Sequence, residues 1–397
     1  MHRRLVVLIV ALALVAVACG SDGSVVDATA ASGDPEADDA EFTVAQIEST
    51  PREDVPSALT DAAQPGFPDP LIDLSRVRSG GPPPDGIPSI DDPIFQSASS
   101  VDWLSPTEAV LALEIDGESR AYPIQVLTWH ELVNDTIGDT PVTVSYCPLC
   151  NSALAYDRRL GERILDFGTS GSLFNSSMVM YDRQTESLWT HFDATAVAGV
   201  LAGAQLETFP ISTVSWEDFR AANPDASVLT RNTGFRRDYG RNPYEGYDDA
   251  STTPFLFDGE FDDRLEPKAR VVVVRDETGP AVALELGRLL VEGVVEFEAH
   301  GRDLVAVLDP GTASPLHRSE IAAGYDQGAV GVFENEFDGE QLSLSRVEGG
   351  FLDAASDLTF DVLGNDTGGG PGRLRPVAHL DTFWFAIAAF DAGVELV

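Results

Sequence analysis

Short apolar runs, most of them ending at turn residues, recur along the chain from about residue 100 to its C-terminal end. Runs of four to eight residues rich in β-branched and aromatic side chains predict strands. Helical spacing of apolar residues is convincing only over residues 124–133, 216–222 and 382–390. The pattern predicts a mainly β protein with a few short helices (α+β). We expect strands at residues 109–115, 143–146, 153–156, 177–181, 271–274, 281–286, 293–298 and 304–308.

The same order of patterns occurs twice. Residues 109–148 are echoed by 270–310, residues 173–182 by 351–361, and residues 216–229 by 384–396. A constant offset of 162 positions aligns Gly117 with Gly279, Leu127 with Leu289, and Pro148 with Pro310. Repeated order at a fixed offset indicates an internal duplication. We therefore expect two related β-rich units, about 100–235 and 270–397, packed as one body.

The two predicted copies differ in residues that can carry chemistry. The first has Cys147, Cys150 and His130. The second has Asp309 and Thr312, and we expect an apolar strand-like run in place of the helix that bears the histidine. A fold that survives without these side chains in one copy does not need them for stability, so we interpret them as functional.

The first residues have the pattern of a signal peptide. Arg3 and Arg4 precede 14 apolar residues, 5–18, which are fewer than the roughly 18 to 20 needed to span a bilayer. Small residues then lead to Cys19 and Gly20, the arrangement that a lipoprotein peptidase cleaves. We predict a signal peptide at 1–18 and a lipid on Cys19 that anchors the protein to the extracytoplasmic face of the cell membrane. The alternative is ordinary secretion with an incidental cysteine.

Residues beyond the lipidated cysteine are rich in Ala, Ser, Asp and Glu. Such a segment buries too little to offset the entropy of ordering, so we expect a disordered acidic tether over 19–78 and an ordered domain over 79–397.

Composition narrows the classes of function. The formal net charge of −40 argues against a nucleic-acid partner, because binding to nucleic acid begins with neutralising phosphates. With Cys19 lipidated, only two of the three cysteines remain, and two cannot build a disulfide framework for 397 residues. Cys147 and Cys150 can pair only with each other or with a metal ion.

The sequence Cys147-Pro148-Leu149-Cys150 resembles a metal-binding knuckle more than a redox motif. Two cysteines three apart in a tight turn direct both sulfur atoms to one side. In thioredoxin-like sites the first cysteine opens a helix, whereas here residues 151–156 continue as a strand-like run.

Two thiolates leave a metal ion undercoordinated, and further ligands are available. The candidate metal ligands are Cys147, Cys150, His130, His191, Met178 and Met180. Sulfur ligands with imidazole suit copper or zinc. Alternating Met178 and Met180 would share one face of a strand, where a buried core pair is the other interpretation.

His130 is open to three interpretations: a catalytic base, a metal ligand, or a helix-end histidine satisfied by backbone carbonyls. Glu131 and Asp135 could orient its ring as second-shell carboxylates.

Three other features suggest simpler roles. Residues 168–172, Gly-Thr-Ser-Gly-Ser, could cradle an anion, but a turn between two strands is favoured. Asp91 and Asp92 lack the further oxygen ligands that calcium needs. The segment with Tyr244, Tyr247 and Asp248 could rim a pocket, although an aromatic-sealed loop packing between the copies is favoured.

Several segments together resemble the signature of the bacterial and archaeal DUF3179 proteins, a domain of unknown function. They are Tyr122-Pro123, 129–135, Pro141-Val142, 146–153, 167–171, 179–183, 187–189 and 240–244. The resemblance covers roughly residues 80–397. At His191 the chain departs from the family pattern, in which glutamine is common. The resemblance implies no activity.

Three hypotheses about function remain. The first is a metal-binding or metal-dependent envelope protein that uses the two cysteines and His130. The second is a thiol-disulfide protein in which the cysteines cycle. The third is a non-catalytic binding module that uses a cleft between its copies, with the cysteines as an inert staple.

Overall fold

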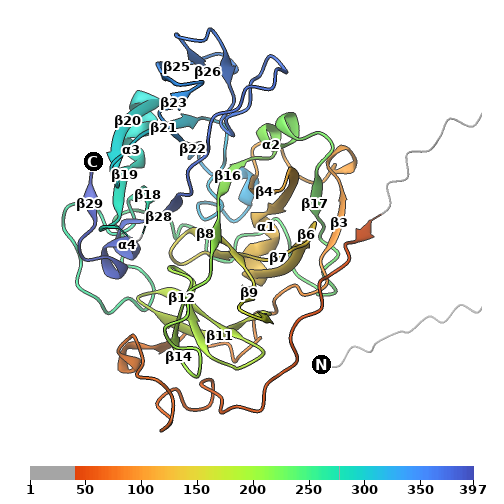
Figure 1. The fold of residues 1–397 in the computed structure, drawn as a ribbon, viewed down its shortest axis with the longest axis vertical. Coiled ribbons are helices and arrows are strands. Elements are labelled where there is room, and N and C mark those ends of the chain that lie inside the picture. The colour runs from red at the N-terminus through yellow and green to blue at the C-terminus, as the bar shows by residue number, and fades with distance from the viewer. Residues whose placement is uncertain (1–40, 277) are drawn as a thin grey trace, which may run out of the picture. The chain divides into compact units, whose positions relative to one another are not determined.

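The computed structural model describes residues 41–276 and 278–397, and these are mainly β (Figure 1). They contain 29 strands and four α-helices of seven residues each. The predicted mainly β fold with a few short helices is confirmed. The predicted signal peptide, Cys19 and residues 20–40 of the predicted tether lie outside the described residues. Within those described, every helix is too short or too polar to span a bilayer.

The first unit is built on a six-stranded sheet with the order β1-β3-β17-β5-β4-β16. Its strands are β1 (Phe42–Thr43), β3 (Ile94–Ser97), β4 (Ala109–Ile115), β5 (Glu118–Pro123), β16 (Ile211–Ser215) and β17 (Ser227–Leu229). Neighbours are antiparallel except β17 and β5, which are parallel. Leu111 and Val110 of β4 pack in two different core clusters. Both faces of the sheet are therefore covered, which explains why β4 is almost continuously apolar.

A second sheet follows α1 (Ile124–His130) and has the order β15-β8-β7-β6. Its strands are β6 (Leu132–Ile137), β7 (Thr140–Cys147), β8 (Ser152–Asp157) and β15 (Thr208–Phe209). The unit closes with α2 (Trp216–Ala222), whose N-cap Ser215 accepts a hydrogen bond from the backbone N–H of Asp218 at 3.0 Å.

A third sheet, with the order β14-β13-β12-β11-β2, lies between these elements in the sequence. Its strands are β2 (Arg78–Ser79), β11 (Phe167–Phe174), β12 (Ser177–Asp182), β13 (Leu188–Thr190) and β14 (Thr195–Ala198). Residues 168–172 lie inside β11, so the predicted turn between strands is wrong. The pairing with β12 shifts register between Thr169 and Ser172, and Gly171 has φ 73°. The glycine serves a bulge rather than a turn. A small hairpin joins β9 (Arg159–Leu160) and β10 (Arg163–Ile164).

The second unit contains three main sheets. The first has the order β28-β18-β19-β29, with β18 (Arg270–Val274), β19 (Val282–Glu285), β28 (Leu380–Phe383) and β29 (Glu395–Leu396). The second sheet consists of β20 (Val294–Ala299), β21 (Arg302–Asp309) and β22 (Ala329–Glu334). The third consists of β25 (Leu344–Val347), β26 (Gly350–Asp353) and β27 (Thr359–Phe360). β23 (Glu336–Phe337) and β24 (Glu340–Gln341) form a hairpin. The helices are α3 (Leu286–Glu292) and α4 (Trp384–Phe390).

The two units have the same pairing scheme around their first hairpin. β5 lies between antiparallel β4 and parallel β17, and β19 lies between antiparallel β18 and parallel β29. α3 begins at Leu286, 162 positions after Ile124 begins α1. β20 and β21 keep the same offset from β6 and β7 at both ends.

The second unit therefore has a helix where a strand-like run was expected, and that expectation is wrong. Leu286 and Leu289 are buried on one side of α3, whereas Leu290 and Val291 are 46% and 87% exposed. The exposed apolar residues hide the helical period, so the segment looks uniformly apolar. His130 aligns with Glu292 of this helix.

Two predicted helices are shorter than expected. α1 ends at His130 rather than at residue 133, because Glu131 has φ 60° and Leu132 begins a strand. α4 begins at Trp384 rather than at residue 382, because β28 extends to Phe383.

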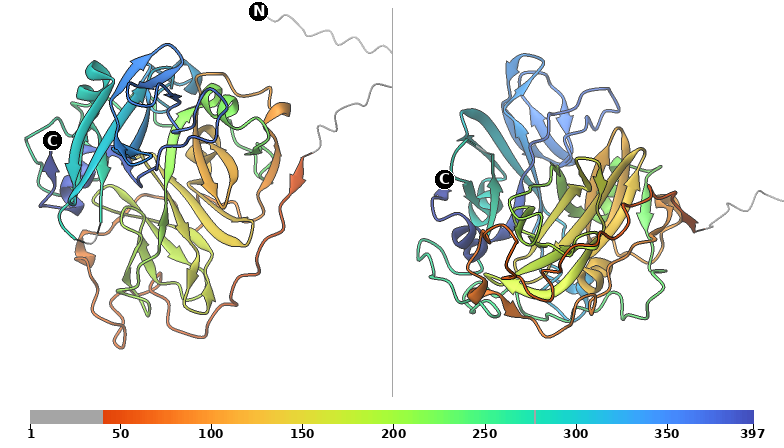
Figure 2. Two further views of the ribbon diagram at one scale, coloured as in Figure 1. Left: turned by 45° about the horizontal axis from the view of Figure 1, so that its top comes forward. Right: turned by 60° about the horizontal axis from the view of Figure 1, so that its bottom comes forward.

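Residues 41–78, expected as part of a tether, form an ordered arm along the first unit, drawn in red and orange in Figures 1 and 2. β1 pairs with β3. The backbone N–H of Thr50 donates to Ile164 O at 2.9 Å, and that of Leu71 donates to Val197 O at 2.9 Å. Ala58 is buried with Val179 and Val197 in a core cluster of the third sheet. Backbone pairing, which composition does not reveal, holds this acidic segment in place.

The two units contact each other, and Figure 2 shows them side by side in both views. One core cluster contains Cys147, Cys150 and Met180 of the first unit with Val273 and Trp384 of the second. The backbone N–H of Phe383 donates to Cys150 O at 3.1 Å. The described residues, 41–276 and 278–397, belong to one compact unit. The turn that bears the two cysteines therefore lies where the units meet.

Candidate functional site

The two cysteines lie in a tight connection between antiparallel strands. β7 ends at Cys147, β8 begins at Ser152, and these two residues pair. Asn151 closes the turn with φ 49°, and its Oδ1 accepts a hydrogen bond from Tyr146 OH at 3.0 Å. Asparagine tolerates this left-handed conformation better than most residues. The expected strand, turn and strand are confirmed, and no helix follows the first cysteine.

Both thiols are free and fully buried, with exposed fractions of 1% for Cys147 and 0% for Cys150. Burial raises the pKa of Cys147 well above its ordinary value, and a hydrogen bond to Cys150 adds to the rise. Burial acts in the same direction on Cys150, but hydrogen bonds from Cys147, Ser152 and Ser177 outweigh it, and the pKa of Cys150 is lowered. Of the two, Cys150 is therefore the thiol that loses its proton more readily.

His191 connects to Cys150 through a serine. Cys150 Sγ lies 2.9 Å from Ser152 Oγ, which lies 2.9 Å from His191 Nε2. His191 Nδ1 lies 3.0 Å from Ser145 Oγ. Burial lowers the pKa of His191, so its ring is neutral at neutral pH. If Nε2 carries the proton and donates to Ser152, then Ser152 can donate to the sulfur of Cys150 and Nδ1 can accept from Ser145.

His130 lies in a different environment from the cysteines. Its Nδ1 is 2.7 Å from Pro88 O, and its Nε2 is 2.6 Å from Tyr239 OH. Burial is the main cause that lowers its pKa to about 4. Both ring nitrogens are used by these partners, and the structure does not bring His130 together with Cys147 and Cys150. This arrangement is close to the interpretation of a helix-end histidine satisfied by a backbone carbonyl.

The expected role of Glu131 and Asp135 in orienting the ring of His130 is wrong. Pro88 and Tyr239 hold that ring instead. Asp135 Oδ2 accepts hydrogen bonds from Arg120 Nη1 and from Tyr122 OH, each at 2.6 Å. Asp135 belongs to a buried ion pair of the first unit.

Met178 and Met180 lie on one face of β12, as predicted. Both pack in the cluster that contains the cysteines, whereas Val179 packs in another cluster. Both are buried in the core. Met178 also adjoins His191, whose backbone N–H donates to Met178 O at 3.1 Å.

The described residues contain no group of three or more His, Cys, Asp or Glu side chains arranged to hold a metal ion. Asp91, considered for calcium, accepts hydrogen bonds from Asn134 Nδ2 at 2.8 Å and from Arg183. The structure thus brings Cys147, Cys150 and His191 into one neighbourhood and leaves His130 outside it.

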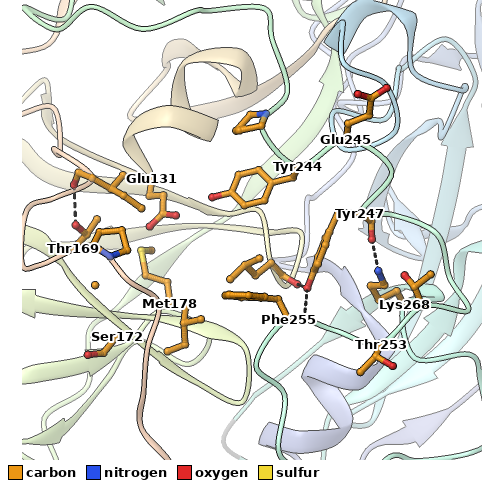
Figure 3. Close-up of a pocket in the computed structure, with 18 of the residues that line it drawn as sticks. Glu131, Thr169, Ser172, Met178, Tyr244, Glu245, Tyr247, Thr253, Phe255 and Lys268 are labelled. Carbon is orange, nitrogen blue, oxygen red and sulfur yellow. Dashed lines mark hydrogen bonds between the residues drawn. The ribbon is translucent and has the colours of Figure 1, made fainter.

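A pocket of about 600 Å³ lies beside the cysteine turn (Figure 3). Its wall includes Glu131 after α1, Leu149 of the turn, Thr169 of β11 and Met178 of β12. The segment between the two units supplies a further part of the wall, namely Pro243, Tyr244, Glu245, Gly246, Tyr247, Thr252, Thr253 and Phe255. Tyr244 and Tyr247 thus line a pocket, and they also pack against the core cluster that both units share, as the favoured interpretation of an aromatic loop between the copies predicts.

Tyr247 lies in the pocket wall and forms a hydrogen bond with the cysteine turn. Its hydroxyl donates to Leu149 O at 3.1 Å, and the backbone N–H of Phe255 donates to that hydroxyl at 3.1 Å. Lys268 Nζ lies 4.1 Å from the centre of the Tyr247 ring and donates to its carbonyl oxygen. No pattern in the sequence marks Lys268. Asp248 faces the second unit, where it accepts a hydrogen bond from Ser314 Oγ.

Glu131 has a backbone conformation that suits glycine. Its φ and ψ are 60° and −33°, and those of Gly293 in the second unit are 76° and −32°. Each N–H donates to the carbonyl oxygen four residues earlier, Leu127 O or Leu289 O, at 2.7 Å. A residue with a Cβ in this region is strained by about 1 kcal/mol or more. The 162-residue offset, which places Glu131 opposite a glycine, is the sequence signal that would have pointed to it.

The carboxyl of Glu131 faces the pocket and forms no hydrogen bond with another described residue, and the residue is 8% exposed. Burial raises its pKa well above the ordinary value. The strained backbone and the largely buried acid are both unfavourable to folding, which is typical of a functional residue.

Comparison with known proteins gives a family. The model of the family described as "Protein of unknown function (DUF3179)" matches residues 84–393. No curated protein and no solved structure matches the chain. Glu131, Leu149, Thr169 and Tyr244, which line the pocket, all lie in segments that carry the resemblance in the sequence. Since the match covers most of the chain, the protein belongs to the DUF3179 family.

Proposed function

We propose that this protein is a cell-envelope lipoprotein that carries out thiol-disulfide chemistry with Cys147 and Cys150. The observation that carries the proposal is the geometry of two free, buried thiols three residues apart: Cys150 Sγ lies 2.9 Å from Ser152 Oγ and 3.5 Å from Ser177 Oγ, and these contacts favour the thiolate of Cys150 over that of Cys147. One thiolate that attacks and one thiol that resolves are what a dithiol needs for exchange.

The exchange balances with a disulfide of a partner as oxidant. The thiolate of Cys150 attacks one sulfur of that disulfide, forms a mixed disulfide and releases the other sulfur as a thiolate. Cys147 loses its proton and attacks Cys150, which forms the Cys147–Cys150 disulfide and releases the second partner thiolate. The partner gains two electrons, and the proton of Cys147 protonates a released thiolate. Because Cys150 is fully buried, the turn that bears it must open for a partner to reach its sulfur.

The experiment is a redox titration of the purified protein. The protein is equilibrated with glutathione buffers of varied ratio, and the Cys147–Cys150 disulfide is followed by alkylation and mass spectrometry. We expect one two-electron transition with both cysteines fully reduced at one end. Thiols that stay reduced at every ratio would contradict the proposal, as would a disulfide that never reduces.

A second candidate function is binding of a soft metal ion, copper or zinc, by Cys147 and Cys150. The observation that favours it is the placement of two free thiols, Met178 and His191 in one buried neighbourhood. His191 Nε2 would have to exchange its hydrogen bond with Ser152 to become a ligand. Elemental analysis of protein from its native envelope tests this directly. One equivalent of metal that protects both thiols from alkylation would favour it over exchange.

Attachment to the membrane through Cys19 is part of the proposal and is supported by the sequence of residues 1–20. Replacing Cys19 by serine should prevent labelling with a radioactive fatty acid and release the protein from the membrane fraction. A Cys19→Ser protein that stays in the membrane fraction would contradict lipid anchoring.

We also propose that the two units arose by duplication of one β-rich unit. The support is the shared pairing around β5 and β19 and the common offset of α1, β6 and β7 from α3, β20 and β21. A superposition of the two units in an experimental structure, with these elements equivalent and connected in the same order, tests it.

A further inference from the structure

We propose that the loop of residues 231–241, the arginine loop, docks on a membrane surface that carries anionic phospholipid headgroups. The inference rests on the lipid anchor at Cys19 proposed above, because it names the face that the anchored protein turns toward the bilayer. It does not depend on the thiol chemistry of the two cysteines.

The arginine loop gathers positive charge in a strongly acidic chain. Its eleven residues contain four arginines and one aspartate, whereas the whole protein has a formal net charge of −40. Arg236 and Arg241 are exposed, and Arg237 is half-buried. None of these three side chains forms an ion pair with a described residue. The loop therefore presents positive charge to its surroundings.

The contacts of these side chains leave most of their donors unused within the described part of the chain. Arg237 Nη1 donates to Arg236 O at 3.2 Å, and Arg241 Nη1 lies 3.5 Å from Ser319 Oγ. Arg236 and Arg237 also line a hollow of about 480 Å³ together with Trp129. A guanidinium has five N–H donors in a fork that matches a phosphate group. The hollow can thus receive the phosphate of a lipid headgroup.

The arginine loop lies where the anchoring segment joins the body of the protein. Glu41, the first described residue, accepts a hydrogen bond at its Oε2 from Asn232 Nδ2 of the loop at 2.7 Å. β1, which follows it, is an edge strand of the six-stranded sheet and is drawn in red in Figure 1. Twenty-two positions separate Cys19 from Glu41, and they can span at most about 75 Å. The anchor therefore holds this face within reach of the bilayer.

Aromatic side chains beside the loop favour a membrane over a soluble polyanion. Phe42 and Phe235 are 42% and 44% exposed. Trp129 is half-buried, and its indole N–H donates to Arg241 O at 3.2 Å. Aromatic rings next to basic side chains suit the boundary between headgroups and acyl chains. A soluble polyanion would neutralise the arginines but would leave both phenylalanine rings uncovered.

The acidic surface elsewhere on the protein opposes docking only weakly. At physiological ionic strength charges are screened over about 8 Å, so the residues in and next to the loop decide the sign of the local charge. Asp238 lies in the loop, and Glu41 and Glu320 contact it. These three acids face four arginines, and Glu41 binds Asn232 rather than an arginine. Positive charge is thus in excess at this face.

The test measures binding of the unlipidated protein, residues 20–397, to vesicles by co-sedimentation. Vesicles of phosphatidylglycerol and phosphatidylcholine in equal parts provide the anionic surface, and vesicles of phosphatidylcholine alone are the control. We expect binding to the anionic vesicles only, and weaker binding as the salt concentration rises. The double variant Arg236→Ala, Arg237→Ala should bind roughly 30-fold more weakly, since each arginine near an anionic surface contributes about 1 kcal/mol.

The matched control is the double variant Arg346→Ala, Arg375→Ala in the second unit. Both arginines are exposed and form no ion pair with a described residue, so the net charge changes by the same amount. This variant should bind like the unchanged protein, and thermal unfolding should show that both variants are folded.

Equal binding to the two kinds of vesicle, no binding to either, or an equal loss in the two double variants would overturn the inference. Fatty-acid labelling of Cys19 in the full chain reports on the anchor separately. A protein that is labelled but whose unlipidated form ignores anionic vesicles would keep the proposed anchor and lose the proposed docking face.

Discussion

At the scale of single residues, Cys147 and Cys150 differ although they are three positions apart. The difference comes from hydrogen bonds: Cys150 receives them from Cys147, Ser152 and Ser177, and these outweigh the effect of burial on its pKa. The proton that Cys147 holds is thus part of what stabilises the thiolate of Cys150. Changing one thiol should change the chemistry of the other.

Replacing Cys147 by alanine should raise the pKa of Cys150, because a hydrogen bond to its sulfur is lost. The rate of alkylation of Cys150 by iodoacetamide at pH 7 should fall by up to about tenfold for each unit by which the pKa rises. The measurement is the alkylation rate against pH, followed by mass spectrometry.

Cys147→Ser is the matched control, because a serine hydroxyl can still donate to the sulfur of Cys150. In this variant the pKa of Cys150 should stay nearer to its value in the unchanged protein. Identical profiles for the alanine and serine variants would show that Cys147 does not stabilise the thiolate.

His130 should make the stability of the protein depend on pH. Its pKa is about 4 in the folded protein and 6.5 in the unfolded chain, chiefly because the ring is buried. Between pH 4 and pH 6.5 the unfolded chain binds a proton that the folded protein does not bind. The neutral ring therefore contributes fully to the free energy of unfolding above pH 6.5, and this contribution is lost as the pH falls toward 4. The loss is at most about 3 kcal/mol.

Urea unfolding of the unchanged protein and of His130→Gln at pH 4.5 and pH 7.5 measures this contribution. The stability of the glutamine variant should fall less between the two pH values. Redox behaviour of Cys147 and Cys150 should be the same in both proteins, because the ring contacts Pro88 and Tyr239. A changed redox midpoint in His130→Gln would show that His130 does influence the cysteines.

The sequence identified the cysteines and His191 but favoured His130 as the third member of the site. Spacing along the chain suggested His130, only 17 positions before Cys147. The fold instead brings Ser152 and His191 together by placing β8 near the end of β13, a long-range arrangement that local spacing does not encode. Tyr244 and Lys268 likewise come to the pocket from distant parts of the sequence.

At the scale of elements, the C-terminal ends of α1 and α3 have the same backbone geometry. Both helices end at a residue with positive φ, Glu131 in one and Gly293 in the other. The carbonyl oxygen of each residue accepts a hydrogen bond from the second strand after the helix: Tyr146 N of β7 donates to Glu131 O at 2.8 Å, and Leu308 N of β21 donates to Gly293 O at 2.9 Å. The backbone geometry is therefore common, and only the side chain differs.

Reciprocal substitutions at these ends should have opposite effects on stability. Glu131→Gly should raise the free energy of unfolding by about 0.5 to 2 kcal/mol, because it relieves backbone strain and removes an unpaired buried carboxyl. Gly293→Ala should lower it by about 1 kcal/mol through backbone strain, since the nearest atom to an added Cβ is Arg346 Cδ at an ordinary 3.5 Å. Chemical denaturation of both variants measures the two effects.

A loss of stability in Glu131→Gly comparable to that in Gly293→Ala would show that Glu131 is held for structural reasons. A gain in stability would show that the protein gives up stability to keep the side chain of Glu131.

Local pattern was sufficient for most elements of both units. β4 and α2 match the expected bounds: β4 is a short apolar run that ends at a turn, and α2 combines a helical period with a capping serine. α3 was missed because its exposed side includes Leu290 and Val291. The bulge in β11 was missed because a glycine-rich stretch is equally typical of a turn.

At the scale of the whole molecule, the arm of residues 41–78 is the main departure from expectation. Its composition resembles that of a disordered segment, yet it supplies a strand to the first sheet and buried side chains to the third. Glu53 also pairs with Arg163 at 2.5 Å. Composition indicates how much apolar surface a segment can bury by itself. It does not indicate whether a neighbouring sheet edge can form backbone hydrogen bonds with that segment.

A chain that begins at residue 79 should be less stable than one that begins at residue 41. The shorter chain loses the β1 pairing and the arm contacts with β12 to β14, and we expect its Tm to be at least about 5 °C lower. Differential scanning calorimetry of the two proteins is the measurement. Equal midpoints would show that the arm contributes nothing to the body, as the expected tether over 19–78 implies.

The segment between the units forms part of the pocket wall but carries neither cysteine. It supplies Tyr244, Tyr247 and Phe255 to the pocket wall, whereas both cysteines belong to the first unit. The pocket wall and the two cysteines therefore come from separate stretches of the sequence, so substitutions in residues 243–255 can change the shape of the pocket while both cysteines stay in place.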